Sequence, residues 1–285
     1  MMRSEFVIEG VKKFSIEQIA ESGQAFRWEK DQNGGYTGVA FGKVINVIQE
    51  KDKVIIKGAN KEDHQKIWKN YFDMDRDYGQ LIKGLKGKDI HLDSAILFGE
   101  GIRILNQDLW EMIISFIISG NNNIPRIKKS IDIICEKYGD FIDEIDGKKY
   151  YSFPSPSQLS IATVDDLRKC GVGYRDAYIH KTTKVILEKQ VDLDLIQNMN
   201  LEDARKELKK LTGVGDKVAD CILLFSCKKT TAFPVDTWVK KILTTYYGLK
   251  KTSVKEVNKF AIEYFGEDCG IAQQYLFYYI RNQNL

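Results

Sequence analysis

One lysine and one aspartate, both close to a glycine-rich turn, are the residues of this sequence best suited to chemistry. The segment 211–217 is Leu-Thr-Gly-Val-Gly-Asp-Lys, and Pro-Val-Asp follows at 234–236. We expect Lys217 in the first turn of a helix, where the helix field and desolvation favour the neutral amine, which is a nucleophile. Asp236 is expected to cap a helix that begins just after it, which aims its carboxylate. The pair predicts attack by an amine beside an oriented carboxylate.

The turn itself joins two helical patterns. Apolar residues recur at helical spacing in segments 201–211 and 218–223. Gly213 and Gly215 permit positive φ and close backbone approach, so amides at the start of the second helix, near Val218, can face an anion such as a phosphate. The alternative is an ordinary helical hairpin in which the lysine is solvated and the aspartate only caps its helix.

The size and composition of the chain indicate an ordinary globular protein. Its 285 residues are 43% hydrophobic and 29% charged, and the net charge of +3 neither demands nor excludes nucleic acid as a partner. Two or three subdomains are expected. No run approaches the roughly 20 apolar residues of a membrane span, and residues 1–5 lack the apolar core of a signal peptide. We therefore expect a cytoplasmic protein with no membrane partner.

The cysteines and histidines do not indicate a cofactor. The five cysteines are odd in number and widely spaced, which does not suggest a disulfide framework. They lack the tight cluster of four that holds an iron–sulfur centre, and the three histidines have no zinc-like spacing. The sequence therefore predicts no redox cofactor and no structural metal. A monovalent cation bound by carbonyls of the glycine hairpin stays an open alternative.

Hydrophobic periodicity divides the chain into a strand-rich beginning and a helical remainder. Ser15 and Gln18 form a capping-box pattern that predicts a short helix. Two antiparallel hairpins are then expected, from the segments 26–29, 36–41, 44–49 and 54–57. From about Trp68 onward the pattern is helical throughout. We predict an α+β fold, with an antiparallel sheet subdomain packed on a mainly α-helical region.

We place the boundary between the two parts near residue 105. Residues 1–105 are expected to form the N-terminal sheet subdomain, and residues 106–285 the helical region, with a helix-hairpin-helix motif at about 202–226. Within that region, the apolar pattern from Trp110 to Ile118 predicts a buried helix that ends at a polar loop.

Several segments together resemble the 8-oxoguanine DNA glycosylase family, one of the helix-hairpin-helix families with a catalytic lysine. Besides the hairpin and Pro-Val-Asp, they are Ser-Gly-Gln-Ala-Phe-Arg-Trp at 22–28, Asn-Asn-Asn-Ile-Pro-Arg-Ile at 121–127 and Gly-Ile-Ala-Gln-Gln-Tyr-Leu-Phe at 270–277. Their order and approximate spacing agree, so the resemblance spans nearly the whole chain. It implies a monomeric glycosylase and abasic-site lyase that excises 8-oxoguanine, preferably opposite cytosine, from duplex DNA. A prokaryotic member would be associated with the nucleoid.

The resemblance also implies how the residues would act on a base rotated out of the duplex. Lys217 would attack the sugar and form a Schiff base that leads to β-elimination, while Asp236 would stabilise the charge that develops on the sugar. The Gly23 carbonyl would accept a hydrogen bond from N7–H of 8-oxoguanine, where normal guanine has a lone pair. C-terminal helices would close the pocket. Gln273 would bind the base edge, and Phe277 would stack on one face.

Cys221 lies four residues after the lysine, on the same helical face, and would stack on the other face of the base. Taken alone, Cys221 is better explained as a small buried hydrophobe, and Phe277 as part of the core; the functional interpretation gains only from their occurring together.

Four further residues match family positions that act on the gap left in the duplex. Asn121 would fill the void, Tyr174 would wedge against the neighbouring stack, and Arg126 and Arg175 would contact the unpaired cytosine, whose exposed edge offers acceptors. Each arginine has a surface ion pair as its alternative, and the asparagine a solvated loop. One departure is Trp238, which stands where eukaryotic members have a histidine near the DNA backbone. Its indole can donate to a phosphate, but it cannot carry charge.

Two other functions stay open. A helix-hairpin-helix glycosylase for another damaged base is the first, although relatives that act on alkylated bases generally lack the hairpin lysine, and those that act on pyrimidine lesions typically carry an iron–sulfur cluster. The second is a DNA-binding module without catalysis, which would use the hairpin only to hold phosphates. Such a module has no reason to combine Lys217, Asp236 and a base pocket at these spacings.

Overall fold

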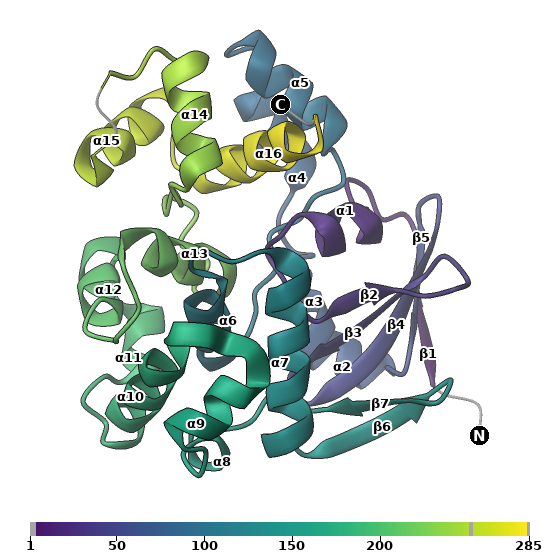
Figure 1. Cartoon of the computed structure of the whole chain (residues 1–285). Helices are drawn as coiled ribbons and strands as arrows, with labels where there is room; N and C mark the ends of the chain where they lie inside the picture. The colour runs from purple at the N-terminus through teal and green to yellow at the C-terminus, as the bar shows by residue number, and fades with distance from the viewer. Residues whose placement is uncertain (1–3, 251–252, 284–285) are drawn as a thin grey trace.

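The chain folds into a five-stranded antiparallel sheet and a mainly helical remainder, as seen in the computed structural model (Figure 1). The structure describes residues 4–250 and 253–283. The predicted α+β fold class is therefore confirmed. The large sheet has the order β1-β5-β4-β3-β2, and a second, two-stranded sheet pairs β6 with β7. The strands are β1 (Glu5–Ile8), β2 (Trp28–Lys30), β3 (Tyr36–Ala40), β4 (Lys43–Glu50), β5 (Lys53–Lys57), β6 (Phe141–Ile145) and β7 (Lys148–Tyr151).

The helices fill most of the remaining chain, and none within the described residues is long and apolar enough to cross a membrane. Their bounds are α1 (Ile16–Glu21), α2 (Lys61–Asp63), α3 (Lys69–Tyr71), α4 (Tyr78–Leu85), α5 (Ile90–Phe98), α6 (Leu109–Ser119), α7 (Ile124–Tyr138), α8 (Pro156–Leu159), α9 (Val164–Leu167), α10 (Asp176–Leu187), α11 (Leu193–Asn198), α12 (Leu201–Leu208), α13 (Asp216–Ser226), α14 (Thr237–Thr245), α15 (Val254–Phe265) and α16 (Cys269–Asn282). Short π and 3-10 turns are η1 (His64–Trp68), η2 (Arg168–Val172) and η3 (Gly173–Arg175).

An aromatic cluster fastens the large sheet to the helices beside it. Trp28 lies opposite Gly38 on the next strand, and a Cβ on that glycine would lie only 2.4 Å from the indole ring. Glycine is therefore needed for the indole to cross β3. The indole Nε1 donates to the Tyr71 hydroxyl at 2.8 Å, and Trp68 and Phe72 pack around the same rings. The sheet and α3 thus share one core.

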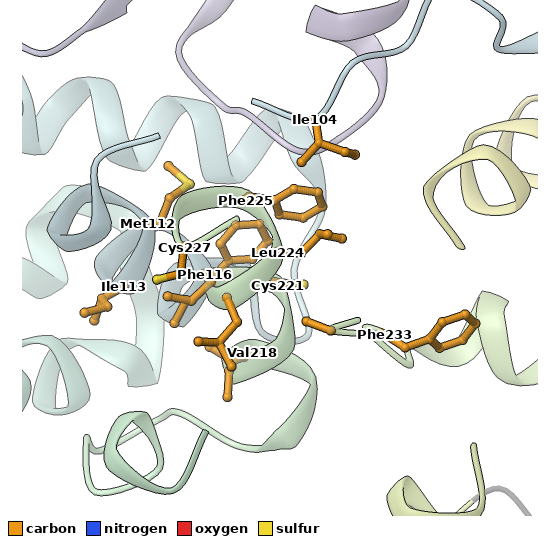
Figure 2. Close-up of a cluster of buried hydrophobic side chains, with 14 of the residues drawn as sticks. Ile104, Met112, Ile113, Phe116, Val218, Cys221, Leu224, Phe225, Cys227 and Phe233 are labelled. Atoms are coloured by element: carbon orange, nitrogen blue, oxygen red, sulfur yellow. The ribbon is translucent and has the colours of Figure 1, made fainter. Parts of the chain in front are cut away.

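The centre of the helical region is the contact between α6 and α13 (Figure 2). Figure 2 shows Phe116 of α6 beside Cys221 and Phe225 of α13. The rings of Phe116 and Phe225 stack with their centroids 5.7 Å apart. Burial of one such ring contributes roughly 1.5–3 kcal/mol to folding. Because α13 is buried from Val218 to Ser226, only its first turn is left near the surface.

Helices from both ends of the sequence meet at one end of the molecule. Figure 1 shows α5, α14, α15 and α16 gathered at the top of the view, and α16 packs on the other three. Helices α4 and α5 precede residue 105 but share the core cluster of the helical region. The division into residues 1–105 and 106–285 stays a prediction.

Two expectations about the sheets need correction. The pattern from Trp68 onward is not helical throughout, because β6 and β7 form a hairpin there. Its turn is Asp146-Gly147 with both φ angles positive, the geometry of a two-residue hairpin turn. The sequence signal was present but was masked by the helical patterns around it. Strand β1 was also missed, although it pairs with β5 along the edge of the large sheet.

The predicted capping box at α1 is only half formed. The Ser15 hydroxyl accepts from the Gln18 amide, as expected. The Gln18 side chain, however, donates to the Phe98 carbonyl at 2.9 Å and accepts from the Gly101 amide at 2.7 Å. Long-range partners at the end of α5 and just after it therefore replace the local one.

A buried charge pair links the sheet to the helical region. Arg27 Nη1 lies 3.7 Å from Glu111 Oε2, and both side chains are nine-tenths buried. The arginine also donates to the Tyr151 carbonyl of β7. Burial raises the pKa of Glu111 to about 7, although the charge of Arg27 opposes that shift. Ionisation of Glu111 is therefore more costly in the folded protein than in the unfolded chain.

This shift predicts a pH dependence of stability. Because the folded pKa of Glu111 lies above its ordinary value of 4.5, the residue destabilises the fold progressively as the pH rises from about 4.5 to 7. Between pH 5 and pH 8, Glu111 should lower the free energy of unfolding by about 1–3 kcal/mol, and we expect Glu111→Gln to abolish this decrease. Urea unfolding of both proteins at the two pH values measures it. Equal pH dependence in the two proteins would show that Glu111 does not titrate in this way.

Candidate active site

The glycine hairpin has the predicted helix-hairpin-helix arrangement, formed by α12 and α13. Gly213 has φ +91°, and the Val214 amide donates to the Leu211 carbonyl at 3.1 Å to close the turn. A Cβ on Gly213 would lie 2.9 Å from the ring of Tyr178 on α10. The Thr182 hydroxyl donates to the Thr212 carbonyl at 3.0 Å. The turn is thus held from behind by α10, which leaves its other side free for a ligand.

The first turn of α13 has no side-chain cap. Gly215 is its N-cap residue, and the first helical hydrogen bond runs from the Ala219 amide to the Gly215 carbonyl. The preceding amides, up to that of Val218, have no helical acceptor. Asp216 could repel an anion here, but its carboxylate is paired with Lys209 at 2.5 Å. The arrangement suits a phosphate bound by backbone amides.

Lys217 and Asp236 are brought together at a surface groove. Lys217 is half-buried in the first turn of α13, with its Nζ 5.2 Å from the centroid of the Phe116 ring. Asp236 caps α14 as predicted, because its Oδ1 accepts from the Val239 amide at 2.8 Å. Both side chains line the groove and also the small cavity beneath it. An amine and an oriented carboxylate therefore face the same space.

Cys221 lies one helical turn below Lys217, at the wall of the small cavity. Burial raises the pKa of its thiol to about 11, and the nearby charge of Lys217 opposes the shift. The thiol is therefore protonated near neutral pH and is a poor nucleophile. Its position suits contact with a flat ligand.

The small cavity has a volume of about 50 Å³ and ends at α16. Gln273, on α16, is 4% exposed, and its Oε1 has no hydrogen-bond partner among the described residues. Phe277 stands four residues later on the same helical face and also lines the cavity. A buried amide oxygen without a donor is costly, so the cavity is suited to a ligand that supplies one.

Gly23 borders both the cavity and the groove. Its φ is +82°, a conformation that glycine adopts without strain. The surrounding loop is fixed, since the buried Gln274 of α16 donates to the Ser22 carbonyl at 2.8 Å. Gln24 donates in turn to the Arg103 carbonyl at 2.9 Å. A rigid backbone segment therefore forms one edge of the pocket.

The groove has a volume of about 660 Å³. The loop after α6, with Asn121 at its tip, forms one side, and Trp238 and Lys240 on α14 form the other. Trp238 is 37% exposed, so its indole is accessible. The groove is large enough for part of a polymer, and Lys217 and Asp236 lie where it meets the small cavity.

Of the four residues predicted to act on the gap in the duplex, three form one cluster: Asn121, Tyr174 and Arg175. Asn121 has φ +50°, and the Arg175 guanidinium donates to the carbonyls of Gly120 and Asn121. The guanidinium also lies 4.4 Å from the centroid of the Tyr174 ring, which is more than half exposed. Arg126, in contrast, is exposed on α7. In this structure Arg175 supports the loop, and Arg126 is the arginine that is free to reach a ligand.

Two residues of the site were missed by the sequence analysis. Phe116 lies beneath the Lys217 amine and lines both spaces, but its apolar helix gave no signal other than a core position. Arg281 lines the groove one helical turn after Phe277. The same four-residue spacing that links Gln273 to Phe277 could have identified it.

Family models match nearly the whole chain. The 8-oxoguanine DNA glycosylase N-terminal domain matches residues 7–113, and the HhH-GPD superfamily of base excision DNA repair proteins matches residues 114–266. A probable N-glycosylase/DNA lyase of Methanothermobacter thermautotrophicus is 34% identical over 75% of this chain and 74% of its own. The N-glycosylase/DNA lyase of Saccharomyces cerevisiae is 32% identical over 85% of this chain and 71% of its own.

A solved structure is more similar still. The 8-oxoguanine glycosylase/lyase of Clostridium acetobutylicum, in complex with double-stranded DNA containing cytosine opposite 8-oxoguanine, has a TM-score of 0.94 and 44% identity. The match covers 100% of this chain and 99% of that one. The two chains therefore share fold and length throughout.

The two hairpin glycines give a matched pair of substitutions. Gly213→Ala would place a methyl group against Tyr178 at φ +91°, whereas Gly215→Ala would enter open space at φ −95°. We expect the first to destabilise the protein by about 1–2 kcal/mol or more, and the second to change stability by less than about 0.5 kcal/mol. Chemical denaturation measures both. Equal effects would mean that the turn does not require the left-handed conformation at Gly213.

Proposed function

This chain belongs to the 8-oxoguanine DNA glycosylase family, and from the geometry of its site we propose how its residues carry out the family's reaction. The protein is a bifunctional glycosylase and abasic-site lyase that acts on 8-oxoguanine in duplex DNA. The observation that carries the residue assignment is the meeting of Lys217 and Asp236 at the mouth of a pocket lined by Gly23, Gln273 and Phe277.

Lys217 is the nucleophile in this proposal. Its neutral Nζ attacks C1′ of the flipped nucleotide, and the C1′–N9 bond breaks with its electron pair going to the departing base. Loss of a proton from the amine and opening of the sugar give a Schiff base. Removal of a proton from C2′ then expels the 3′ phosphate by β-elimination. Asp236 stabilises the positive charge that develops on the sugar. No step requires a metal or a redox cofactor.

Base recognition rests on hydrogen bonds that a guanine-type base can complete. The Gly23 carbonyl accepts from N7–H of 8-oxoguanine, and unmodified guanine would instead bring a lone pair towards it. The unpaired Oε1 of Gln273 accepts from the N1–H and N2–H₂ edge, which selects a guanine ring over an adenine ring. Phe277 and the neutral thiol of Cys221 stack on the two faces.

The DNA itself is held at two places. The uncapped amides of α13 near Gly215 and Val218, with the tight turn at Gly213, bind the backbone of the lesion strand, and the indole N–H of Trp238 donates to a phosphate. On the opposite side of the groove, Asn121 enters the gap left by the flipped base.

Tyr174 wedges the adjoining stack, and its half-exposed ring supports this role. Arg126 then contacts the unpaired cytosine. Because Arg175 is committed to loop carbonyls, its effect on cytosine is largely through the position of the loop. As a DNA repair enzyme, the protein is proposed to work at the cellular DNA, in the cytoplasm.

Covalent trapping tests the role of Lys217. We expect borohydride to reduce the Schiff base and link the protein to duplex DNA that contains 8-oxoguanine opposite cytosine. Lys217→Gln should lower the trapping rate roughly a hundredfold or more, because the nucleophile is lost. Lys206→Gln is a matched control, since that exposed lysine is paired with Asp203 on α12. Adduct formation by Lys217→Gln at the normal rate would exclude Lys217 as the nucleophile.

The preference for the base opposite the lesion distinguishes the proposed role of Arg126 from that of Arg175. We expect Arg126→Ala to narrow the ratio of single-turnover rates for cytosine and adenine opposite the lesion by roughly tenfold, through loss of a charge-assisted hydrogen bond. Arg175→Ala should also slow excision opposite both bases, because the Asn121 loop loses its support. If neither variant changes the ratio, the opposite base is not read by these residues.

A further inference from the structure

The guanidinium of Arg281 lies where two walls of the base pocket meet. Its Cζ is 5.4 Å from the centroid of the Phe277 ring, and its Nη2 donates to the Glu21 carbonyl at the start of the Gly23 loop. Arg281 therefore contacts both the ring that stacks on the base and the loop that carries the N7 acceptor. We propose that Arg281 is a positioning residue for base recognition, which holds these two walls at a fixed separation.

The loop is fastened to α16 at two points. Besides the bond from Arg281 to the Glu21 carbonyl, the buried Gln274 donates to the Ser22 carbonyl at 2.8 Å. Gln273 and Phe277 belong to the same helix. The acceptor for N7, the amide for the base edge and the stacking ring are thereby tied to one rigid element. A hydrogen bond from a guanidinium to a carbonyl and a cation–π contact each help to keep that arrangement.

Arg281 also occupies the space that a side chain at position 23 would fill. A Cβ on Gly23 would lie 2.7 Å from Arg281 Nη1 and 3.3 Å from Phe277 Cε1. Any side chain at this position would therefore have to displace the end of Arg281, besides adopting a φ of +82°. The two residues are physically coupled, so substitutions at them should not have additive effects.

The pocket is not fully satisfied without a ligand. Arg281 Nη1 and Gln273 Oε1 are both buried, and neither has a hydrogen-bond partner among the described residues. An unpaired buried donor costs free energy, so its presence in a folded protein calls for an explanation. In this position the guanidinium packs against Gly23 and Phe277, whereas its Nη1 makes no hydrogen bond to the described residues.

The inference rests on the proposed function, and it predicts that substitution of Arg281 affects base recognition and not the lyase step. Excision requires the base to be held between Gly23 and Phe277. The lyase step on a preformed abasic site has no base to hold, but it uses the same Lys217. A residue that positions the base pocket must therefore affect excision more than the lyase step, whereas a residue that only binds DNA would slow both alike.

The test compares two single-turnover rates at saturating enzyme, one on 8-oxoguanine opposite cytosine and one on a preformed abasic site opposite cytosine. We expect Arg281→Ala to lower the ratio of excision to lyase rate about tenfold, the effect of losing one charged hydrogen bond. Arg281→Lys keeps the charge but lacks the planar guanidinium group, so its ratio of excision to lyase rate should lie between those of wild type and Arg281→Ala. Lys259→Ala, which removes an exposed lysine of α15 paired with Glu263, serves as the matched control.

A second measurement keeps the proposal testable if Arg281→Ala is unstable. Gly23→Ala should lower the same ratio in the wild-type background, and by a smaller factor in the Arg281→Lys background, because the 2.7 Å contact between the added Cβ and Arg281 Nη1 is absent there. An unchanged ratio in Arg281→Ala and Arg281→Lys, with or without lower thermal stability, would overturn the positioning role. Absence of 8-oxoguanine excision in the wild-type protein would instead refute the proposed function itself.

Discussion

Burial of α13 against α6 is the contact on which the active site depends. The helix is buried from its third residue onward, with Phe225 stacked on Phe116, so its rotation and depth are fixed. Lys217 is thereby placed at the groove and Cys221 one turn lower, in the pocket wall. The same packing presents the uncapped first turn to a phosphate. The placement of the proposed nucleophile, of the pocket wall and of the amides proposed to bind the DNA backbone therefore follows from one helix orientation.

A second constraint comes from α16, because selectivity requires several groups to keep their relative positions. This helix is buried between α5, α14 and α15, and it carries Gln273 and Phe277. It also fastens the Gly23 loop, which belongs to the N-terminal part of the chain. The pocket is therefore assembled from segments that are far apart in the sequence. The hydrogen bond from Gln274 to the Ser22 carbonyl, for example, joins residues 252 positions apart. The proposed chemistry depends on the position of α13, and the proposed base recognition depends on the hydrogen bonds between α16 and the Gly23 loop.

Local rules predicted the parts of this arrangement that local physics determines. The glycine hairpin, the capping role of Asp236 and the four-residue spacing from Gln273 to Phe277 follow from helix geometry. Long-range choices were not predictable in the same way. Gln18 binds backbone groups at the end of α5 and just after it instead of completing its capping box. Phe116 is indistinguishable from any other core residue until its neighbours are known. The roles of individual site residues were accessible mainly through family resemblance.

The unpaired amide oxygen of Gln273 indicates how the pocket could distinguish between bases. Gln273 is 4% exposed, and its Oε1 has no hydrogen-bond partner among the described residues. A buried acceptor without a donor costs free energy, so a ligand that supplies a donor there gains more than a ligand that does not. In the proposed mechanism the edge of a guanine-type base supplies that donor, whereas the edge of an adenine-type base would leave the oxygen unpaired. The proposed selectivity therefore rests on an incompletely satisfied pocket, because a pocket whose polar groups were already paired would favour no base over another.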